Sequence, residues 1–308
     1  MSNSKSKADV KYVGFFLAHK FSFVYYFFMI TFDSLTLKAF IEENREFLTG
    51  ARIQRIQQPT RRDFVLTIRG FDKDSRAETR KLYININPQL HHICFMSKEN
   101  EETIEVYEKF GDKYLARDKN ELNVNEQALK DDARQKKVIA GYVAGLPDDA
   151  EIFEVGSAAG RDAKYLRSLG YKNITVSDVA GFFLDELKKE GFEPVKFNLI
   201  TDEFDKKYDF IFCWAVLVHF TKDEAKAAIY KMYDALKDGG RLAFCVKHKE
   251  GAVEEWGDYK NMIGAKRYFS YWTEDELKQI LEELNFKEFD IVRYGGTRAC
   301  WLECYGEK

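Results

Sequence analysis

Acidic and small residues follow one another closely in EIFEVGSAAGRD, residues 151–162. The apolar run predicts a buried strand that ends at Glu154, followed by a turn and the start of a helix. Small residues keep this turn free of side-chain bulk, so a ligand can lie against the backbone N–H groups at the helix N-terminus. They are Gly156, Ala158, Ala159 and Gly160. We therefore expect a small charged ligand at this turn.

A second acid ends the next predicted strand, NITVSDVA, where Asp178 follows Glu154 by 24 residues. A carboxylate at such a strand end can accept hydrogen bonds from both hydroxyls of a ribose, which is why nucleoside-binding α/β folds use one. Asp178 also precedes the helical pattern FFLDELKK, where it can act as a helix N-cap. The two roles are compatible, and the pair of acids favours a nucleoside ligand.

The spacing of the small residues separates two kinds of nucleoside site. The dinucleotide fingerprint G-x-G-x-x-G would fall on Gly156, Ala158 and Arg161, so two of its three glycines are missing. The form E-x-G-x-x-x-G, carried by Glu154, Gly156 and Gly160, instead resembles motif I of class I S-adenosylmethionine (SAM) dependent methyltransferases. That resemblance implies SAM as the cofactor. It also implies cofactor contacts from this turn and the next strand end, at Glu154, Gly156, Ser157, Ala158, Gly160, Arg161, Asp178 and Val179.

The next two strand patterns extend the resemblance. The short pattern PVKFN ends at Asn198 and Leu199, where the family places residues against the adenine, with Asn in place of its usual acid. The pattern YDFIFCWAVLVHF predicts a fourth strand with Cys213 and Trp214 at its open end, where ligands of open α/β sheets bind. We expect Asn198, Leu199 and Cys213 beside the cofactor, and Trp214 near the reacting atoms.

Helix caps and strand patterns continue to the end of the sequence. Thr221 with Glu224, and Thr273 with Glu276, form two capping boxes. Residues 238–240, Asp-Gly-Gly, are expected to end the first of these helices before the strand RLAFCVK, and FDIVRYG and ACWLECYGE predict an antiparallel final pair. The expected fold is α/β, a Rossmann-like seven-stranded methyltransferase sheet with helices on both faces, over residues 99–308.

Two helical patterns precede this core, one containing Tyr107, Phe110 and Tyr114 and one over about 121–144. Small-molecule methyltransferases often begin with similar helices, which carry a Tyr-x6-Tyr pair and fold over the cofactor as a lid. Tyr107 and Tyr114 have this spacing, so the resemblance implies that Tyr114 contacts the cofactor. Aromatic residues at helical spacing also occur in plain core packing. We expect lid helices over residues 103–145 and the α/β core over 146–308.

Little dedicated catalytic machinery is expected, because a sulfonium methyl is already activated and transfer mainly requires orientation in a dry site. His219 is the histidine near the expected active face, and with Trp214 it is a candidate catalytic residue. His219 can instead pack beside the capping turn. The sequence lacks N/D-P-P-Y and Pro-Cys motifs, and the long aromatic and charged loop at 250–271 suits a substrate wall. A small-molecule acceptor is therefore favoured, and no metal site is expected.

The first third of the chain differs in charge from the rest. Residues 1–98 carry 16 basic and 9 acidic side chains, a balance of +7, which leaves −10 for residues 99–308 in a chain of net charge −3. The charge run KENEE at 98–102 predicts a domain boundary. The five cysteines include no C-x-x-C pair and fall mostly in strand patterns, as in a reduced, cytoplasmic protein.

A second resemblance, to the opening of the NFACT amino-terminal domain (fibronectin-binding protein A), lies in FDSLTLKAFIEENREFLTGARIQRIQQPTRRDFVLTIRG and KLYININPQLHHICF. It covers residues 29–98 and predicts a small α+β module with an antiparallel meander. Shared positions are Phe32, Asp33, 50–53, Gln58, Pro59, Ile68, Arg69, Asn87, Pro88 and His92. That family acts in ribosome-associated quality control and contacts tRNA, which would suit the arginines at 52, 55, 61 and 62. The alternative interpretation is that these arginines lie on a solvent-exposed face of a hairpin.

The apolar, aromatic run at residues 12–32 resembles a signal peptide or an anchor. His19 and Lys20 interrupt it, the remaining pieces are too short to span a bilayer, and no small-residue cleavage site follows. We expect no stable membrane association. Residues 1–28 are interpreted as an extension that need not be native, with Met29 as the effective start. The alternative function is a tRNA- or ribosome-associated NFACT-like binding protein whose α/β domain binds SAM without catalysis.

Overall fold

The computed structural model describes residues 34–58, 61, 63–71, 74–86, 92–251, 253–257, 264–295 and 300–308. The chain divides into two compact units, one made mainly of residues 1–97 and the other of most of 98–308. We call them the N-terminal unit and the α/β unit. The apolar run at 12–32, Met29 and several NFACT-like positions (Phe32, Asp33, Pro59, Asn87 and Pro88) lie outside the described residues.

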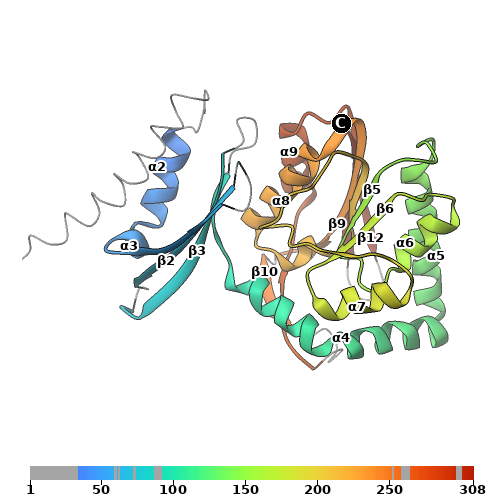
Figure 1. The fold of residues 1–308 in the computed structure, drawn as a ribbon, viewed down its shortest axis with the longest axis horizontal. Helices are drawn as coiled ribbons and strands as arrows, with labels where there is room; N and C mark the ends of the chain where they lie inside the picture. The colour runs from blue at the N-terminus through green and yellow to red at the C-terminus, as the bar shows by residue number, and fades with distance from the viewer. Residues whose placement is uncertain are drawn as a thin grey trace, which may run out of the picture. The chain divides into compact units, whose positions relative to one another are not determined.

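The N-terminal unit consists of two short helices followed by a four-stranded sheet (Figure 1). Its elements are α2 (Ser34–Glu43), α3 (Arg45–Leu48), β1 (Arg52–Gln57), β2 (Asp63–Phe71), β3 (Ala77–Asn85) and β4 (His92–Met96). The strands pair in sequence order, each antiparallel to the next, so the predicted meander is confirmed. The two helices are separated at Asn44, whose φ of −102° and ψ of 14° are not helical.

The core of this unit lies between α3 and one face of the sheet. Phe47 packs with Leu66, Ile68 and Leu82. The absence of a side chain at Gly70 permits the close approach, because a Cβ there would lie 2.6 Å from the carbonyl oxygen of Phe47. Alternating apolar residues of β2 and β3 thus fold against one aromatic anchor.

The α/β unit is built on a seven-stranded sheet in the order β12-β13-β9-β8-β5-β6-β7. Its strands are β5 (Ile152–Val155), β6 (Ile174–Asp178), β7 (Val195–Lys196), β8 (Tyr208–Cys213), β9 (Leu236–His248), β12 (Glu288–Gly295) and β13 (Cys300–Glu307). The five strands from β5 to β9 are parallel, and β12 and β13 complete the sheet in antiparallel register. The predicted fold class is therefore confirmed. The carboxyl ends of β5, β6 and β8 meet at one edge, where open α/β sheets bind ligands.

Helices cover both faces of this sheet, with α5 and α6 on one side and α8 and α9 on the other (Figure 1). The helices are α4 (Lys98–Val124), α5 (Glu126–Val143), α6 (Arg161–Ser168), α7 (Gly181–Lys189), α8 (Lys222–Asp234) and α9 (Glu274–Glu283). The core on the α5 side includes Ile139, Leu166, Phe210 and Phe212, each at most 1% exposed. A short 3-10 turn, η1 (Leu217–His219), and a two-stranded sheet of β10 (Glu254–Gly257) and β11 (Arg267–Ser270) complete the described part.

Both predicted capping boxes are present, at Thr221 with Glu224 and at Thr273 with Glu276. One predicted boundary is wrong: α8 ends at Asp234, and residues 238–240 belong to β9. The cause is long-range pairing, since Gly239 N donates to the Lys308 carbonyl (3.0 Å) and Lys308 N donates to the Gly240 carbonyl (2.9 Å).

Three other boundaries are shifted from their expected places. The second lid helix begins at Glu126, because the Asn125 side chain accepts from the N–H groups of Gln127 and Ala128. The third strand of the core, β7, ends at Lys196, two residues before Asn198. The fourth strand, β8, ends at Cys213, and the chain then turns into η1.

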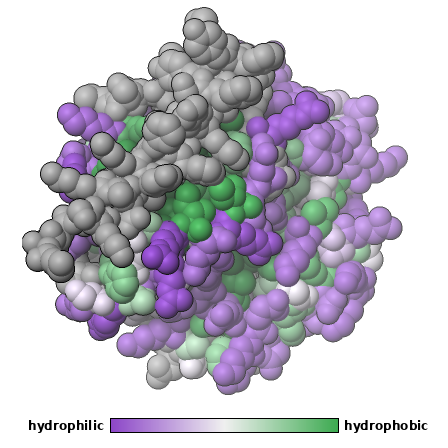
Figure 2. Space-filling view, turned by 60° about the vertical axis from the view of Figure 1, so that its left-hand side comes forward, coloured by the Kyte–Doolittle hydropathy of each residue, from purple (hydrophilic) through white to green (hydrophobic). Residues whose placement is uncertain are grey.

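Hydrophilic side chains (purple) cover most of the described surface in the view of Figure 2, and hydrophobic ones (green) form small areas between them. None of the described helices combines the length and apolar character needed to cross a membrane.

Candidate active site

The turn after β5 adopts a backbone conformation that small residues tolerate best. Gly156, Ala158 and Gly160 have φ values of +71°, +46° and +73°. A Cβ at Gly156 would lie 2.3 Å from Val216 Cγ2. The turn is fixed to β6, because Ser157 N donates to the Ser177 carbonyl at 2.7 Å. Glycine at position 156 is thus required both by φ and by the close approach of a neighbouring side chain.

Asp178, at the end of β6, lies against this turn. Its Oδ2 accepts from Ala158 N at 3.1 Å and its Oδ1 accepts from Ala180 N at 3.0 Å. Burial raises the pKa of this carboxyl to about 6, although the backbone N–H donors favour the charged form. A carboxylate has about four lone-pair sites, so the backbone N–H donors leave acceptor capacity for a ligand hydroxyl.

Glu154, the second acid, is 4% exposed. Burial, and after it the nearby Asp162 carboxyl, raise the pKa of Glu154 well above its usual value. Its Oε2 atom is buried without a hydrogen-bond partner. Burial therefore favours the protonated form of this carboxyl, which lies behind the turn.

A cavity lies at the carboxyl ends of β5, β6 and β8. Nine of the predicted site residues line it: Tyr114, Gly156, Ala158, Asp178, Val179, Asn198, Leu199, Trp214 and His219. The sequence analysis did not assign several other lining residues to the site, among them Tyr107, Phe183, Phe197, Val216 and Phe220. The aromatic ones were hidden in ordinary core patterns, although the Tyr-x6-Tyr spacing did mark Tyr107.

Five predicted cofactor contacts do not line this cavity: Glu154, Ser157, Gly160, Arg161 and Cys213. Arg161 turns to Asp162, with 2.9 Å between Nε and Oδ1, and borders a different depression beside Lys136 and Lys164. Cys213 is fully buried, and burial raises the pKa of its thiol. The remaining three shape the turn from behind: Glu154 by its buried carboxyl, Ser157 by its hydrogen bonds, and Gly160 as the left-handed residue before α6.

Helix α4 covers the cavity. Its Tyr107 and Tyr114 rings are 5.7 Å apart, and both lie 5.9 Å from the Phe183 ring. Glu108 fastens the helix to α7, because its carboxylate oxygens accept from Gly181 N (2.8 Å) and Phe182 N (3.0 Å). The two tyrosines predicted for a lid therefore lie on the cavity wall.

His219 and Tyr107 form a hydrogen-bonded chain with Arg267. His219 Nδ1 lies 2.8 Å from the Tyr268 carbonyl, which can only accept, so this nitrogen carries the proton. His219 Nε2 then accepts from Tyr107 Oη at 2.9 Å, and Tyr107 Oη accepts from Arg267 Nη1 at 2.6 Å. Burial is the main reason that the pKa of His219 falls to about 3 and that of Tyr107 rises to about 12. At neutral pH both side chains are uncharged.

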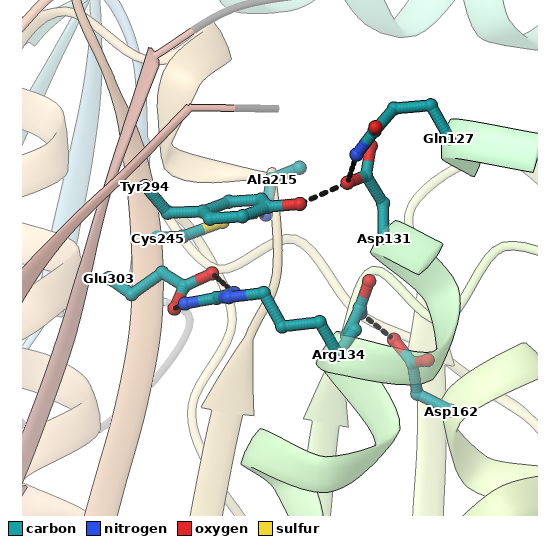
Figure 3. A network of polar contacts seen from close by, with 9 residues as sticks. Gln127, Asp131, Arg134, Asp162, Ala215, Cys245, Tyr294 and Glu303 are labelled. Carbon is teal, nitrogen blue, oxygen red and sulfur yellow. Dashed lines mark hydrogen bonds and ion pairs between the residues drawn. The ribbon is translucent and has the colours of Figure 1, made fainter. Parts of the chain in front are cut away.

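A polar network holds α5 in place beside the sheet (Figure 3). Arg134 makes two hydrogen bonds of 2.5 Å to the carboxylate of Glu303 in β13, and its guanidinium carbon lies 3.7 Å from the centre of the Tyr294 ring. The Tyr294 hydroxyl donates to Asp131, also in α5. The paired geometry and the burial of Glu303 make this a strong attachment.

No group of three or more metal-ligating side chains that could hold a metal ion occurs among the residues that the structure describes.

Together, the sheet order, the glycine turn and the carboxylate at the end of β6 define an α/β protein with a nucleoside-type site. The chain belongs to the methyltransferase domain family, whose model matches residues 124–288. No curated protein matches the sequence.

Solved structures with the same fold are similar to this chain at low sequence identity. Magnesium protoporphyrin IX methyltransferase from Synechocystis PCC 6803, with bound SAM, is 17% identical with a TM-score of 0.54, over 68% of this chain and 97% of that one. The Burkholderia thailandensis 1,6-didemethyltoxoflavin-N1-methyltransferase is 17% identical with a TM-score of 0.51, over 74% and 95%. The DhpI–SAM–HEP complex is 17% identical with a TM-score of 0.52, over 69% and 99%.

Proposed function

We propose that the protein is a SAM-dependent methyltransferase acting on a small-molecule acceptor. The observation that carries this proposal is the Asp178 carboxylate, which two backbone N–H groups orient at the wall of the cavity beside a turn that has no room for a side chain. The SAM-bound and small-molecule methyltransferases with the same fold support the choice of cofactor and acceptor class.

The residues present fit the parts of this cofactor. Asp178 would accept from the ribose hydroxyls through its remaining acceptor capacity. Asn198 and Leu199 would lie beside the adenine. Glu154, which is buried behind the turn, would support the turn from there. Tyr114 would close the cavity from α4.

When bound, the cofactor supplies a methyl group activated by a sulfonium. The protein's part is to orient the acceptor and to exclude water, and the aromatic wall of Tyr107, Phe183, Trp214 and Phe220 suits both tasks. His219 is a poor general base, because its pKa is about 3 and its accepting nitrogen is engaged by Tyr107. It instead positions Tyr107.

Calorimetry with SAM and with S-adenosylhomocysteine tests this proposal. We expect both to bind the intact chain, and Asp178→Ala to weaken binding by about 10- to 100-fold, because hydrogen bonds to a charged group are removed. Asp185→Ala is the matched control, since that exposed aspartate only pairs with Lys188 at 2.9 Å. If the intact chain binds neither compound, the proposal fails.

The N-terminal unit supports the alternative function, an NFACT-like module that contacts RNA. Arg52 and Arg69 are exposed and lie directly opposite each other on β1 and β2. Like charges at such a position repel unless an anion lies between them. RNA binding by the full chain, weakened in an Arg52→Glu/Arg69→Glu double variant, would support this function, and unchanged binding would oppose it.

A further inference from the structure

Two cationic side chains are buried next to the cavity. Arg267 in β11 is 3% exposed and Lys247 in β9 is 5% exposed. Both contact the ring of Phe269, whose centre lies 3.6 Å from Lys247 Nζ and 5.3 Å from the guanidinium carbon of Arg267. Burying a charge costs several kcal/mol unless an opposite charge or hydrogen bonds compensate it. Two neighbouring cations increase that cost, and burial together with Arg267 lowers the pKa of Lys247 to about 7.

The hydrogen-bonding capacity of Arg267 is only partly used. Its Nη1 donates to Tyr107 Oη, and its buried Nε has no hydrogen-bond partner. In the part of the chain that the structure describes, no carboxylate pairs with it. Glu255, the acid that acts on Lys247, lies 2.7 Å from Lys249 Nζ and also accepts from Tyr271. Among the described residues, the guanidinium therefore has unused donors and no counter-ion.

Tyr107 connects these cations to the cavity. Tyr107 and His219 line the cavity, and the hydroxyl of Tyr107 accepts the hydrogen bond from Arg267. A phenol with a pKa of about 12 is neutral, so it cannot compensate the charge of the guanidinium. An anionic oxygen at the same place would be a stronger acceptor.

Helix α4 also has a break beside this tyrosine. Phe110, three residues further on, has a φ of −125° and a ψ of 17°, which interrupts the helix. Phe110 therefore separates the part of α4 that carries Tyr107 from the rest of the helix.

We propose that the methyl acceptor is a small molecule with an anionic group, a carboxylate or a phosphate, on an apolar body. The anion takes the place of the Tyr107 hydroxyl against Arg267, with Lys247 as the second positive charge, and the apolar body lies along the aromatic wall. This inference deepens the proposed function and rests on it.

The test compares benzoate and phenyl phosphate with neutral benzamide, each titrated into the full chain with and without S-adenosylhomocysteine. We expect the better of the two anions to bind at least tenfold more tightly than benzamide, and the tighter one identifies the anionic group. Arg267→Met should remove this preference while S-adenosylhomocysteine still binds. Asp178→Ala should weaken S-adenosylhomocysteine binding and keep the preference for the anion. Failure of the subsite is therefore distinguishable from failure of the cofactor site.

Tyr107→Phe gives the sharpest comparison, because it removes the competing phenol oxygen and keeps the ring. Its preference for the anion should be equal to or higher than that of the wild-type chain. If Arg267→Met does not fold, Lys247→Met replaces it as the test variant. We expect Lys247→Met to lower the affinity for the anion several-fold. Equal binding of all three probes, an unchanged preference in a folded Arg267→Met variant, or loss of the preference in Tyr107→Phe would each overturn the proposal.

Discussion

The proposed cofactor side and acceptor side of the cavity are assembled over very different lengths of sequence. On the cofactor side, Ala158 N bonds the Asp178 carboxylate 20 positions away, within one strand-helix-strand unit. On the acceptor side, Tyr107 bonds His219 and Arg267, which are 112 and 160 positions away. The first side is therefore fixed by local backbone geometry, whereas the second exists only after four distant segments have packed together.

This difference can be tested most strongly at Gly156. Gly156→Ala places a Cβ at a φ of +71° and 2.3 Å from Val216, so we expect a loss of about 2–4 kcal/mol in the free energy of unfolding and no measurable SAM binding. Gly141→Ala in α5 is the control, because it has open space and a helical backbone. That control should gain about 0.5–1 kcal/mol. Denaturant unfolding and calorimetry measure both, and a Gly156→Ala variant with full SAM affinity would contradict a backbone-determined site.

The pH dependence of stability tests the electrostatics of the cofactor side. The pKa of Asp178 is raised from 3.8 to about 6 in the folded protein, so between these values the folded state holds the proton more tightly than the unfolded state. The contribution of this group is fully present below about pH 4 and is lost as the pH rises through 6, a change on the order of 3 kcal/mol.

Asp178→Asn removes the titrating group and provides the comparison. The difference in unfolding free energy between wild type and this variant should fall with increasing pH across that window, measured by urea unfolding from pH 4 to 7. A difference that stays constant with pH would show that the carboxyl is not buried in the folded state.

The acceptor side should be sensitive to single long-range contacts instead. Thr103 Oγ1, on α4, accepts from the buried Tyr268 N–H at 3.2 Å. Thr103→Val leaves this donor unsatisfied, so we expect a loss of about 1–2 kcal/mol in unfolding free energy with SAM affinity unchanged within about twofold. Thr103→Ser keeps the hydroxyl and is the matched control. A parallel loss of SAM affinity in the valine variant would mean that the two sides are not separable.

The same contrast explains what the sequence could predict. The glycine turn and Asp178 follow from local patterns, the seven-stranded sheet followed from the family resemblance, and the two Thr–Glu boxes marked the starts of α8 and α9 correctly. Arg161 was placed with the ligand on motif position alone, but its neighbour Asp162 attracts the side chain elsewhere.

Arg267 and Lys247 were not singled out. Each lies in a short segment that gives no sign that a charged residue is buried, and the contacts come from distant elements: Tyr107 of α4 for Arg267, and Phe269 and Trp301 of β11 and β13 for Lys247. The early end of α8 was also missed because of a distant contact. The backbone of Lys308 forms hydrogen bonds with Gly239 and Gly240 and makes the Asp-Gly-Gly segment part of β9.

The attachment of α5 to β12 and β13 has a consequence for how molecules enter and leave. Arg134 and Asp131 hold that helix to β13 and to the edge strand β12, whereas α4, which covers the cavity, is interrupted within its length. The helix is interrupted at Phe110, and it ends before Asn125, which caps α5. Access to the cavity would therefore depend on α4, and a crosslink between Glu108 and the start of α7, which already lie within hydrogen-bond distance, is expected to slow exchange of bound molecules.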